Sequence, residues 1–232
     1  MVTVLYREFI NSFKSIRSIL IILFLTFVSY QSANFLENNQ DIINIFLEEG
    51  LDENTIYNVS ISFIILLFGF LFVSTISHDL INSETEMNTI RLLVTKISRL
   101  EVMLGKLVGT LLFWIAIISI SYAIVFALSG TWSMNKYLQT LVLLFYIICF
   151  VLLISTIITK AKLSMFLGIF SGISLPIIGL VATMSNEWYW MPFKYILPFN
   201  YLSKPFGYMF IPFAVAMTLF GISMLIIKRR DL

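Results

Sequence analysis

Six long stretches of uncharged, mostly apolar residues constrain the fold of this 232-residue chain more than any other feature. They are Ser18–Leu36, Ile56–Ile76, Leu107–Leu128, Tyr137–Thr159, Leu163–Met184 and Phe206–Ile227. Each has about the length that an α-helix needs to cross roughly 30 Å of hydrocarbon. The alternation expected of β-strands is absent, which disfavours a β-barrel. The sequence therefore predicts an all-α membrane protein, with six transmembrane helices in one domain over residues 1–232.

Composition excludes several classes of protein. The chain is 59% apolar and 12% charged, whereas soluble domains are roughly half apolar and about a quarter charged, so a water-soluble enzyme is excluded. A single cysteine, Cys149, excludes a disulfide framework, and the single histidine, His78, is too few for a membrane metalloprotease. Gly105 and Lys106 do not form a P-loop, because Leu107 follows them. No catalytic, cofactor-binding or metal site is predicted in this chain.

The distribution of Lys and Arg predicts the orientation in the membrane. With the N-terminus inside, the inner segments carry 12 of these residues and the outer loops only Lys136, Lys194 and Lys204. The inner set is Arg7, Lys14, Arg17, Arg91, Lys96, Arg99, Lys106, Lys160, Lys162, Lys228, Arg229 and Arg230. The first outer loop is acidic instead. We therefore expect both termini to face the cytoplasm.

Two segments outside the spans have unusual patterns. Residues 1–17 place Leu5, Phe9, Phe13 and Ile16 at helical spacing opposite polar residues, as in a helix that lies in the inner interface; an ordinary basic flank is the alternative. Residues 185–205 are rich in aromatic residues and interrupted by proline, which allows only short helical pieces. We expect a broken-helix outer segment, either re-entrant or interfacial.

The inner segment 82–106 is the least lipid-like part of the chain. Ser83 followed by Glu86 resembles a capping box, and an apolar stripe at helical spacing runs on from Ile90. We expect a cytoplasmic amphipathic helix that buries its stripe against the spans, the membrane surface or a soluble partner.

Small residues and prolines mark further candidate sites. Gly105 and Gly109, and likewise Gly168 and Gly172, form GxxxG patterns that allow close helix approach, either inside the subunit or at a dimer face. Pro176 and Pro212 are positioned to bend the last two spans. We take Gly168, Gly172, Pro176 and Pro212 as candidates for a dimer face or a transport pathway.

The stretch ETEMNTIRLLVTKISRLEVMLGK, from Glu84 to Lys106, resembles the type-2 permease family of ABC transporters. That family shows an acidic pair, Gly-Thr, a leucine pair, Pro, Ser-Arg and Gly-Lys in this order. Asn88 stands where glycine is usual, and the proline before Ser98 is missing. The resemblance extends over nearly the whole chain, including KYILPFNYL before the last span and the terminal KRRDL.

The resemblance implies a permease subunit of an exporter that binds two copies of a separate ABC ATPase, in which ATP and Mg²⁺ are bound. The segment between the second and third spans would be the coupling helix that docks into the ATPase. Its docking residues would be Glu84, Glu86, Thr89, Ile90, Arg91, Leu93, Val94 and Arg99. The other partners would be a second permease copy, in a homodimer or a heterodimer, and membrane lipid, but no nucleic acid.

The cargo is the least determined part of the prediction. Uncharged spans, aromatic outer residues and an acidic outer loop favour an amphipathic or antimicrobial peptide, exported across a bacterial cytoplasmic membrane. A lipid, drug or polysaccharide exporter remains an alternative. So does a membrane sensor or immunity protein that transports nothing.

Overall fold

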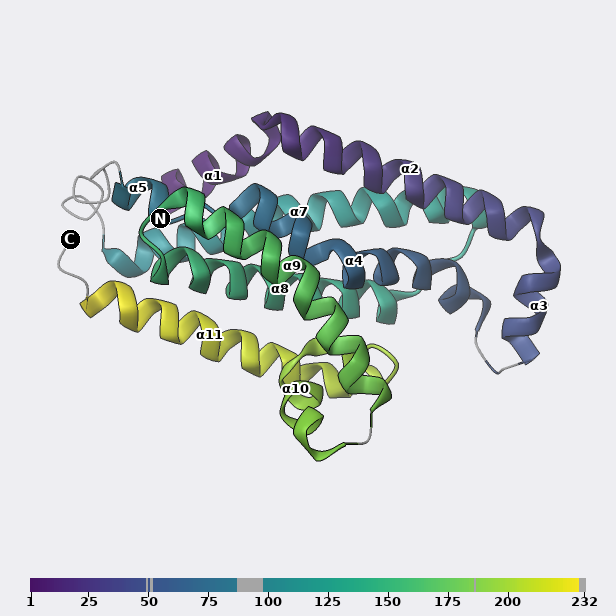
Figure 1. Cartoon of the computed structure of the whole chain (residues 1–232). Helices are drawn as coiled ribbons and strands as arrows, with labels where there is room; N and C mark the ends of the chain where they lie inside the picture. Colours follow the sequence, from purple (N-terminus) through teal and green to yellow (C-terminus); the bar gives the residue numbers. More distant parts are fainter. Residues whose placement is uncertain (49, 51, 87–97, 186, 230–232) are drawn as a thin grey trace.

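The structure is a computed structural model and describes residues 1–48, 50, 52–86, 98–185 and 187–229. Within these ranges all regular secondary structure is helical, and six helices are long and apolar enough to cross a membrane (Figure 1). They are α2 (Ile16–Asn38), α4 (Glu53–Ser77), α7 (Arg99–Ser129), α8 (Met134–Ile157), α9 (Ala161–Met184) and α11 (Phe210–Arg229), the last preceded by η3 (Phe206–Met209). The all-α class and the six predicted spans are confirmed.

The third span helix begins well before the apolar stretch predicted from sequence. α7 begins at Arg99 because Ser98 and Glu101 form a capping box: the Ser98 side chain accepts from the Glu101 N–H, and the Ser98 N–H donates to the Glu101 carboxylate. The capping box predicted at Ser83 and Glu86 is wrong. Ser83 lies inside the short helix α5 (Asn82–Glu86), and its hydroxyl donates to the Asp79 carbonyl.

The centre of the bundle is α8, packed against α4 and α11. Its most apolar 18-residue window is 61% buried, against 22% for α2, so α8 is the interior helix and α2 a peripheral one. Three hydroxyl groups join α4, α7 and α8 in the core: Ser62 lies 2.8 Å from Thr140 and 3.3 Å from Tyr122, and Tyr122 lies 3.0 Å from Thr140. Such side-chain hydrogen bonds hold membrane helices together where apolar burial alone cannot select a partner.

The remaining elements are short and lie at the ends of the spans. They are α1 (Val2–Lys14), α3 (Gln40–Glu48), η1 (Trp188–Trp190), α10 (Met191–Ile196) and η2 (Pro198–Tyr201). The acidic first outer loop contains the helix α3, which buries Ile43. The proline-rich outer segment is divided into short helical pieces, and α10 and η2 each carry a proline in the first turn, where its missing N–H costs no helical hydrogen bond.

Candidate functional site

One end of the bundle collects α1, α5, the start of α9 and the last turn of α11 (Figure 1). The described basic residues that the sequence assigned to the inner side belong to this end. They are Arg7, Lys14, Arg17, Arg99, Lys106, Lys160, Lys162, Lys228 and Arg229. Of the residues expected to dock the ATPase, Glu86 at the end of α5 and Arg99 at the start of α7 belong to the same end.

The predicted docking residues are only partly described. Thr89, Ile90, Arg91, Leu93 and Val94 lie outside the described residues, as does the side chain of Glu84. Glu86 and Arg99, which flank residues 87–97, are described. Each of them contacts a different span helix, and neither contact is visible from the sequence pattern.

Glu86 caps the start of α9. The backbone N–H of Ala161, the first residue of α9, donates to Glu86 Oε2 at 3.1 Å. α9 has no side-chain cap of its own, because its N-cap residue is Lys160. A carboxylate at a helix N-terminus both satisfies an orphan N–H group and complements the helix dipole. Glu86 therefore joins α5 to the start of the fifth span.

Arg99 caps the end of α11. Its Nη1 donates to the backbone carbonyls of Ile227 at 2.9 Å and Lys228 at 3.0 Å. The carbonyl groups in the last turn of a helix accept no hydrogen bond from the helix itself. A guanidinium at that position supplies donors and complements the negative end of the helix dipole. Arg99 therefore joins the start of the third span to the end of the sixth.

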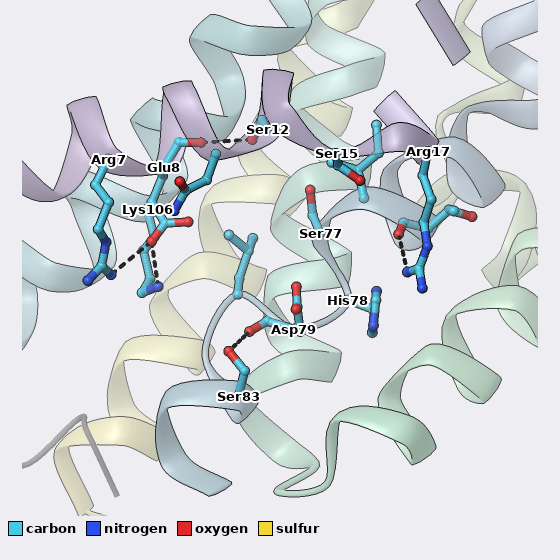
Figure 2. A pocket seen from close by; sticks show the side chains of 14 residues that line it. Arg7, Glu8, Ser12, Ser15, Arg17, Ser77, His78, Asp79, Ser83 and Lys106 are labelled. Atoms are coloured by element: carbon cyan, nitrogen blue, oxygen red, sulfur yellow. Dashed lines mark hydrogen bonds and ion pairs between the residues drawn. The ribbon is translucent and has the colours of Figure 1, made fainter. Parts of the chain in front are cut away.

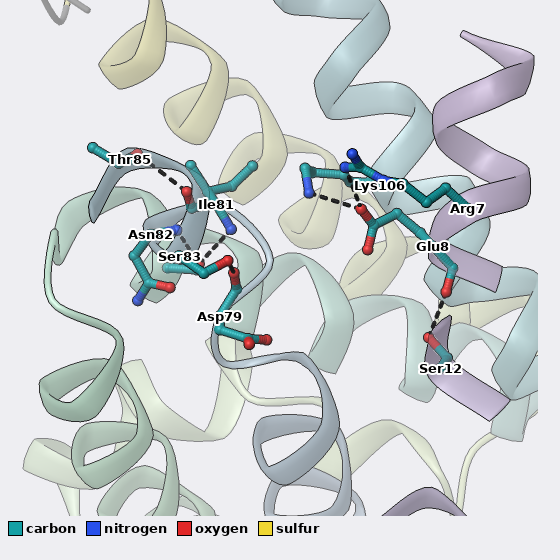
Figure 3. A network of polar contacts seen from close by, with 10 residues as sticks. Arg7, Glu8, Ser12, Asp79, Ile81, Asn82, Ser83, Thr85 and Lys106 are labelled. Atoms are coloured by element: carbon teal, nitrogen blue, oxygen red, sulfur yellow. Dashed lines mark hydrogen bonds and ion pairs between the residues drawn. The ribbon is translucent and has the colours of Figure 1, made fainter. Parts of the chain in front are cut away.

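The turn between α4 and α5 is also fixed to neighbouring helices (Figure 3). Ser155, near the end of α8, accepts hydrogen bonds from the backbone N–H groups of Ile81 at 3.0 Å and Asn82 at 3.4 Å. Ser164, in the first turn of α9, donates to the His78 carbonyl at 2.8 Å. The segment that leads to residue 86 is thus held by both α8 and α9.

The N-terminal helix α1 is attached to α7 by a buried ion pair. Lys106 Nζ lies 2.9 Å from Glu8 Oε1, and Arg7 lies 3.0 Å from the same oxygen (Figure 3). Lys106 is only 2% exposed, and a buried ammonium is tolerated where a carboxylate pairs with it. From sequence, Lys106 is one of the basic residues that flank the spans, and no sequence signal indicates its pairing with Glu8.

Gly105 and Gly109 bring the two helices into contact. A Cβ at Gly105 would lie 3.0 Å from Val4 Cβ, and a Cβ at Gly109 would lie 2.8 Å from the Leu5 carbonyl oxygen. This GxxxG pattern is therefore used within the subunit to dock α1 on α7. Whether α1 lies in the membrane interface stays a prediction.

Gly168 and Gly172 also contact a helix of the same chain. A Cβ at Gly168 would lie 2.9 Å from Ser74 Cβ, and one at Gly172 would lie 2.8 Å from the Leu71 side chain, so α9 packs closely on α4. Pro176 is buried inside α9. Pro212 is buried in the first turn of α11, where its missing N–H costs no helical hydrogen bond. Their assignment to a dimer face or pathway stays a prediction.

The outer segment before the last span is fixed to the start of α8. Lys136 Nζ donates to the Leu202 carbonyl at 3.2 Å, and Gln139 Nε2 donates to the Lys204 carbonyl at 3.1 Å. Burial raises the pKa of Tyr201, whose hydroxyl donates to the Tyr195 carbonyl at 2.9 Å. These contacts make the segment a packed part of the bundle.

A polar cavity of about 370 Å³ lies between α1, the start of α2 and the turn that follows α4 (Figure 2). It is lined by Arg7, Glu8, Asn11, Ser12, Ser15, Arg17, Thr75, Ile76, Ser77, His78, Asp79, Leu80, Ser83 and Lys106. Three successive polar residues at the end of α4, Ser77, His78 and Asp79, all lie on the wall of this cavity.

Comparison with known proteins identifies the family. A family model described as ABC-2 family transporter protein matches residues 2–201, which is most of the chain. No curated protein matches the chain. The resemblance predicted from Glu84–Lys106 is confirmed. The matched family consists of transmembrane subunits, which are not themselves ATPases and generally act with an ABC ATPase partner.

Proposed function

Because the chain belongs to the ABC-2 transporter family, we propose that it is the permease subunit of an ATP-driven exporter in a bacterial cytoplasmic membrane. Two permease copies, or this chain and a related one, enclose the pathway. Two separate ATPase subunits, which themselves bind ATP and Mg²⁺, dock at the end of the bundle that carries Arg99 and Lys106. The concentration of basic residues at this end supports its cytoplasmic position.

The observation that carries the proposal is the pair of contacts on either side of residues 87–97. Glu86 bonds to the first residue of α9, and Arg99 bonds to the last turn of α11. A partner that binds between these two residues acts directly on the ends of two span helices. In this proposal the apolar stripe of Ile90, Leu93 and Val94 docks on the ATPase, together with Glu84, Thr89 and Arg91. Glu86 and Arg99 transmit the movement of the docked segment to the span helices.

In this mechanism the chain converts movement of a surface segment into tilting of its spans. ATP supplies the energy by closing the ATPase dimer, which draws the two coupling segments together. Glu86 and Arg99 then carry α9 and α11 with them, and the interface between the two permease copies opens outward. The apolar centres of the spans contain no Asp, Glu, Lys or Arg, which favours energy supplied by the partner over energy from an ion gradient.

For the cargo we propose an amphipathic or antimicrobial peptide, with a lipid, drug or polysaccharide chain as the alternatives. Asp41 in α3, with Glu48, Asp52 and Glu53, makes the outer end beside α3 acidic, while Ile45, at 57% exposure, adds apolar surface on α3. An acidic field attracts cationic peptides over a distance of about one Debye length, near 10 Å.

The cargo proposal is tested by reversing the charge of Glu48, Glu49, Asp52 and Glu53 to Lys. Resistance of cells to a cationic amphipathic peptide should fall several-fold, whereas resistance to an uncharged apolar drug serves as the control. Unchanged peptide resistance would show that this acidic surface does not attract the cargo.

The permease proposal is tested by purifying the tagged full-length chain in mild detergent. We expect an ABC ATPase in near-equimolar amount, with ATP hydrolysis that the permease stimulates. Leu93→Asp should abolish the stimulation while the spans stay folded, because a charge on the apolar stripe opposes burial against the partner. Lys14→Gln, at the same end but outside the segment, is the matched control. A chain that purifies without ATPase contradicts the permease proposal and favours a sensor or immunity protein.

A further inference from the structure

The polar cavity beside α1 has two chemically distinct sides (Figure 2). On one side Glu8 is neutralised by its ion pairs with Arg7 and Lys106. On the other side Arg17 and Asp79 carry opposite charges. Within the described part of the chain they form no ion pair with each other or with other residues. This second side is not used in the proposed transport mechanism.

The start of α2 is an uncapped helix N-terminus that opens onto this side. Ser15, its N-cap residue, makes no side-chain cap hydrogen bond, and the first turn contains Arg17 but no acidic residue. A cation at this position is opposed by the positive end of the helix dipole, and a bound anion would complement both. The Arg17 guanidinium donates one hydrogen bond to the Thr75 carbonyl, at 3.4 Å, and its other N–H groups can donate to a ligand.

Ser77 independently indicates a ligand at the same place. It is 2% exposed, its hydroxyl lines the cavity, and no hydrogen bond to a described residue occupies it. A hydroxyl on the wall of a cavity finds its hydrogen-bond partner inside the cavity, in water or in a ligand. The neighbouring His78 ring uses Nδ1 toward the Ser74 carbonyl, at 3.2 Å, so its second ring nitrogen also remains available.

Asp79 favours a ligand that also carries a positive group. Its backbone carbonyl accepts from Ser83, but its carboxylate makes no hydrogen bond or ion pair with a described residue. An anion alone would be repelled by this carboxylate, and a cation alone by Arg17. A ligand with both charges a short distance apart satisfies both residues.

Apolar side chains of α2 continue from the cavity along the outside of the bundle. Ile16, Ile19 and Leu20 are 76%, 47% and 62% exposed, respectively. They lie in the first turns of a span, where acyl chains are the expected neighbours. The ligand therefore combines a zwitterionic headgroup with apolar tails.

We propose that this cavity binds the phosphoethanolamine headgroup of a phospholipid. The phosphate lies at Arg17, Ser77 and the N-terminus of α2, and the ammonium group lies at Asp79. The acyl chains lie along α2. A volume of about 370 Å³ suits a headgroup, since small-molecule sites begin near about 300 Å³.

The test uses the purified full-length chain and native mass spectrometry with added lipids. Dioleoyl phosphatidylethanolamine should bind about tenfold more tightly than phosphatidylcholine, which has no N–H donors, or phosphatidylglycerol, which has no amine. Free O-phosphoethanolamine should bind much more weakly, because it lacks the tails. Equal binding of this soluble compound would overturn the lipid assignment.

Variants separate the two charged groups. Arg17→Gln should weaken phosphatidylethanolamine and phosphatidylglycerol alike, by about tenfold, the size of one charge-assisted hydrogen bond. The isosteric Asp79→Asn should weaken phosphatidylethanolamine and leave phosphatidylglycerol unchanged or tighter. Ser77→Ala, which removes a hydroxyl without a partner, should weaken both lipids several-fold without disturbing the fold.

Lys14→Gln is the matched control, because Lys14 is an exposed cation close in sequence to Arg17 that does not line the cavity. This variant should bind all three lipids as the parent does. The proposal is overturned if phosphatidylethanolamine shows no preference in the parent. It is equally overturned if Arg17→Gln and Asp79→Asn leave the three affinities unchanged.

Discussion

Arg99, the first residue of α7, and Ile227, in the last turn of α11, are joined by a hydrogen bond of 2.9 Å between Nη1 and the backbone carbonyl. The third and sixth spans are thereby connected at the cytoplasmic end that we propose, next to the segment expected to dock the ATPase. The Glu86 carboxylate makes the corresponding connection to α9 on the other side of that segment.

Arg99→Ala should loosen the end of α11. Two carbonyl groups lose a charged donor, and a hydrogen bond to a charged group contributes about 1.5–3 kcal/mol. Hydrogen exchange in the last turn of α11 should accelerate by at least tenfold. Arg99→Lys, which keeps a cationic donor, should recover part of the protection. Unchanged exchange at Ile227 would show that this contact is not formed in the membrane protein.

Glu86→Ala should weaken the start of α9 and uncouple the transporter. Protection of the Ala161 N–H should fall about two- to fivefold, the range expected for a carboxylate at a helix N-terminus. In the purified complex the ATPase should remain bound while its stimulation falls. Lys162→Ala, an exposed residue in the same first turn, is the control. Loss of the ATPase from the complex would instead assign Glu86 to docking.

Gly109→Ala should detach α1 from α7. The new Cβ would lie 2.8 Å from the Leu5 carbonyl and 3.0 Å from Glu8 Cβ, so the helices have to separate, at a cost of about 1–3 kcal/mol. Thermal unfolding in detergent should shift to lower temperature. Gly221→Ala in α11 meets open space and should stabilise by up to about 1 kcal/mol, as alanine does in a helix. Equal effects of the two substitutions would contradict the packing described for α1.

Lys106→Met and Glu8→Gln should each destabilise the protein. Breaking a buried ion pair costs up to about 3–5 kcal/mol, and Lys106→Met should cost less than Glu8→Gln because Glu8 keeps its ion pair with Arg7. The double variant should lose less than the sum of the two, because either single substitution already breaks the pair between Glu8 and Lys106. Lys14→Met, on the exposed side of α1, should change the free energy of unfolding by less than about 0.5 kcal/mol. Strict additivity in the double variant would contradict direct pairing.

The six spans were predictable because lipid imposes a simple requirement on sequence: about 20 successive residues without charge. The family could also be predicted, because the order of residues from Glu84 to Lys106 is itself the signature. The capping box forms at Ser98 and Glu101, at the start of α7, and not at Ser83 and Glu86. Both candidate pairs have Ser followed three residues later by Glu, and only the tertiary contacts of Glu86 with α9 decide which pair can close.

The contacts of Glu86 and Arg99 were not predictable for a different reason. Glu86 and Ala161 are 75 residues apart in the chain, and Arg99 and Ile227 are 128 apart. Each contact joins a side chain to a backbone group, which carries no sequence signal at the receiving position. The close approach at Gly109 also involves a backbone group, the carbonyl of Leu5, and therefore leaves no signal in the sequence at residue 5.

By itself, then, the sequence determined that this protein lies in a membrane, how many spans it has, which end carries its basic residues and the family to which it belongs. These follow from the local distribution of apolar and charged residues along the chain. Only the tertiary structure decided that Lys106 is a buried partner of Glu8, that α1 docks on α7, and that Arg17, Ser77 and Asp79 share one cavity. Those relationships depend on which helices pack together, and lipid selects apolar surfaces without specifying their partners.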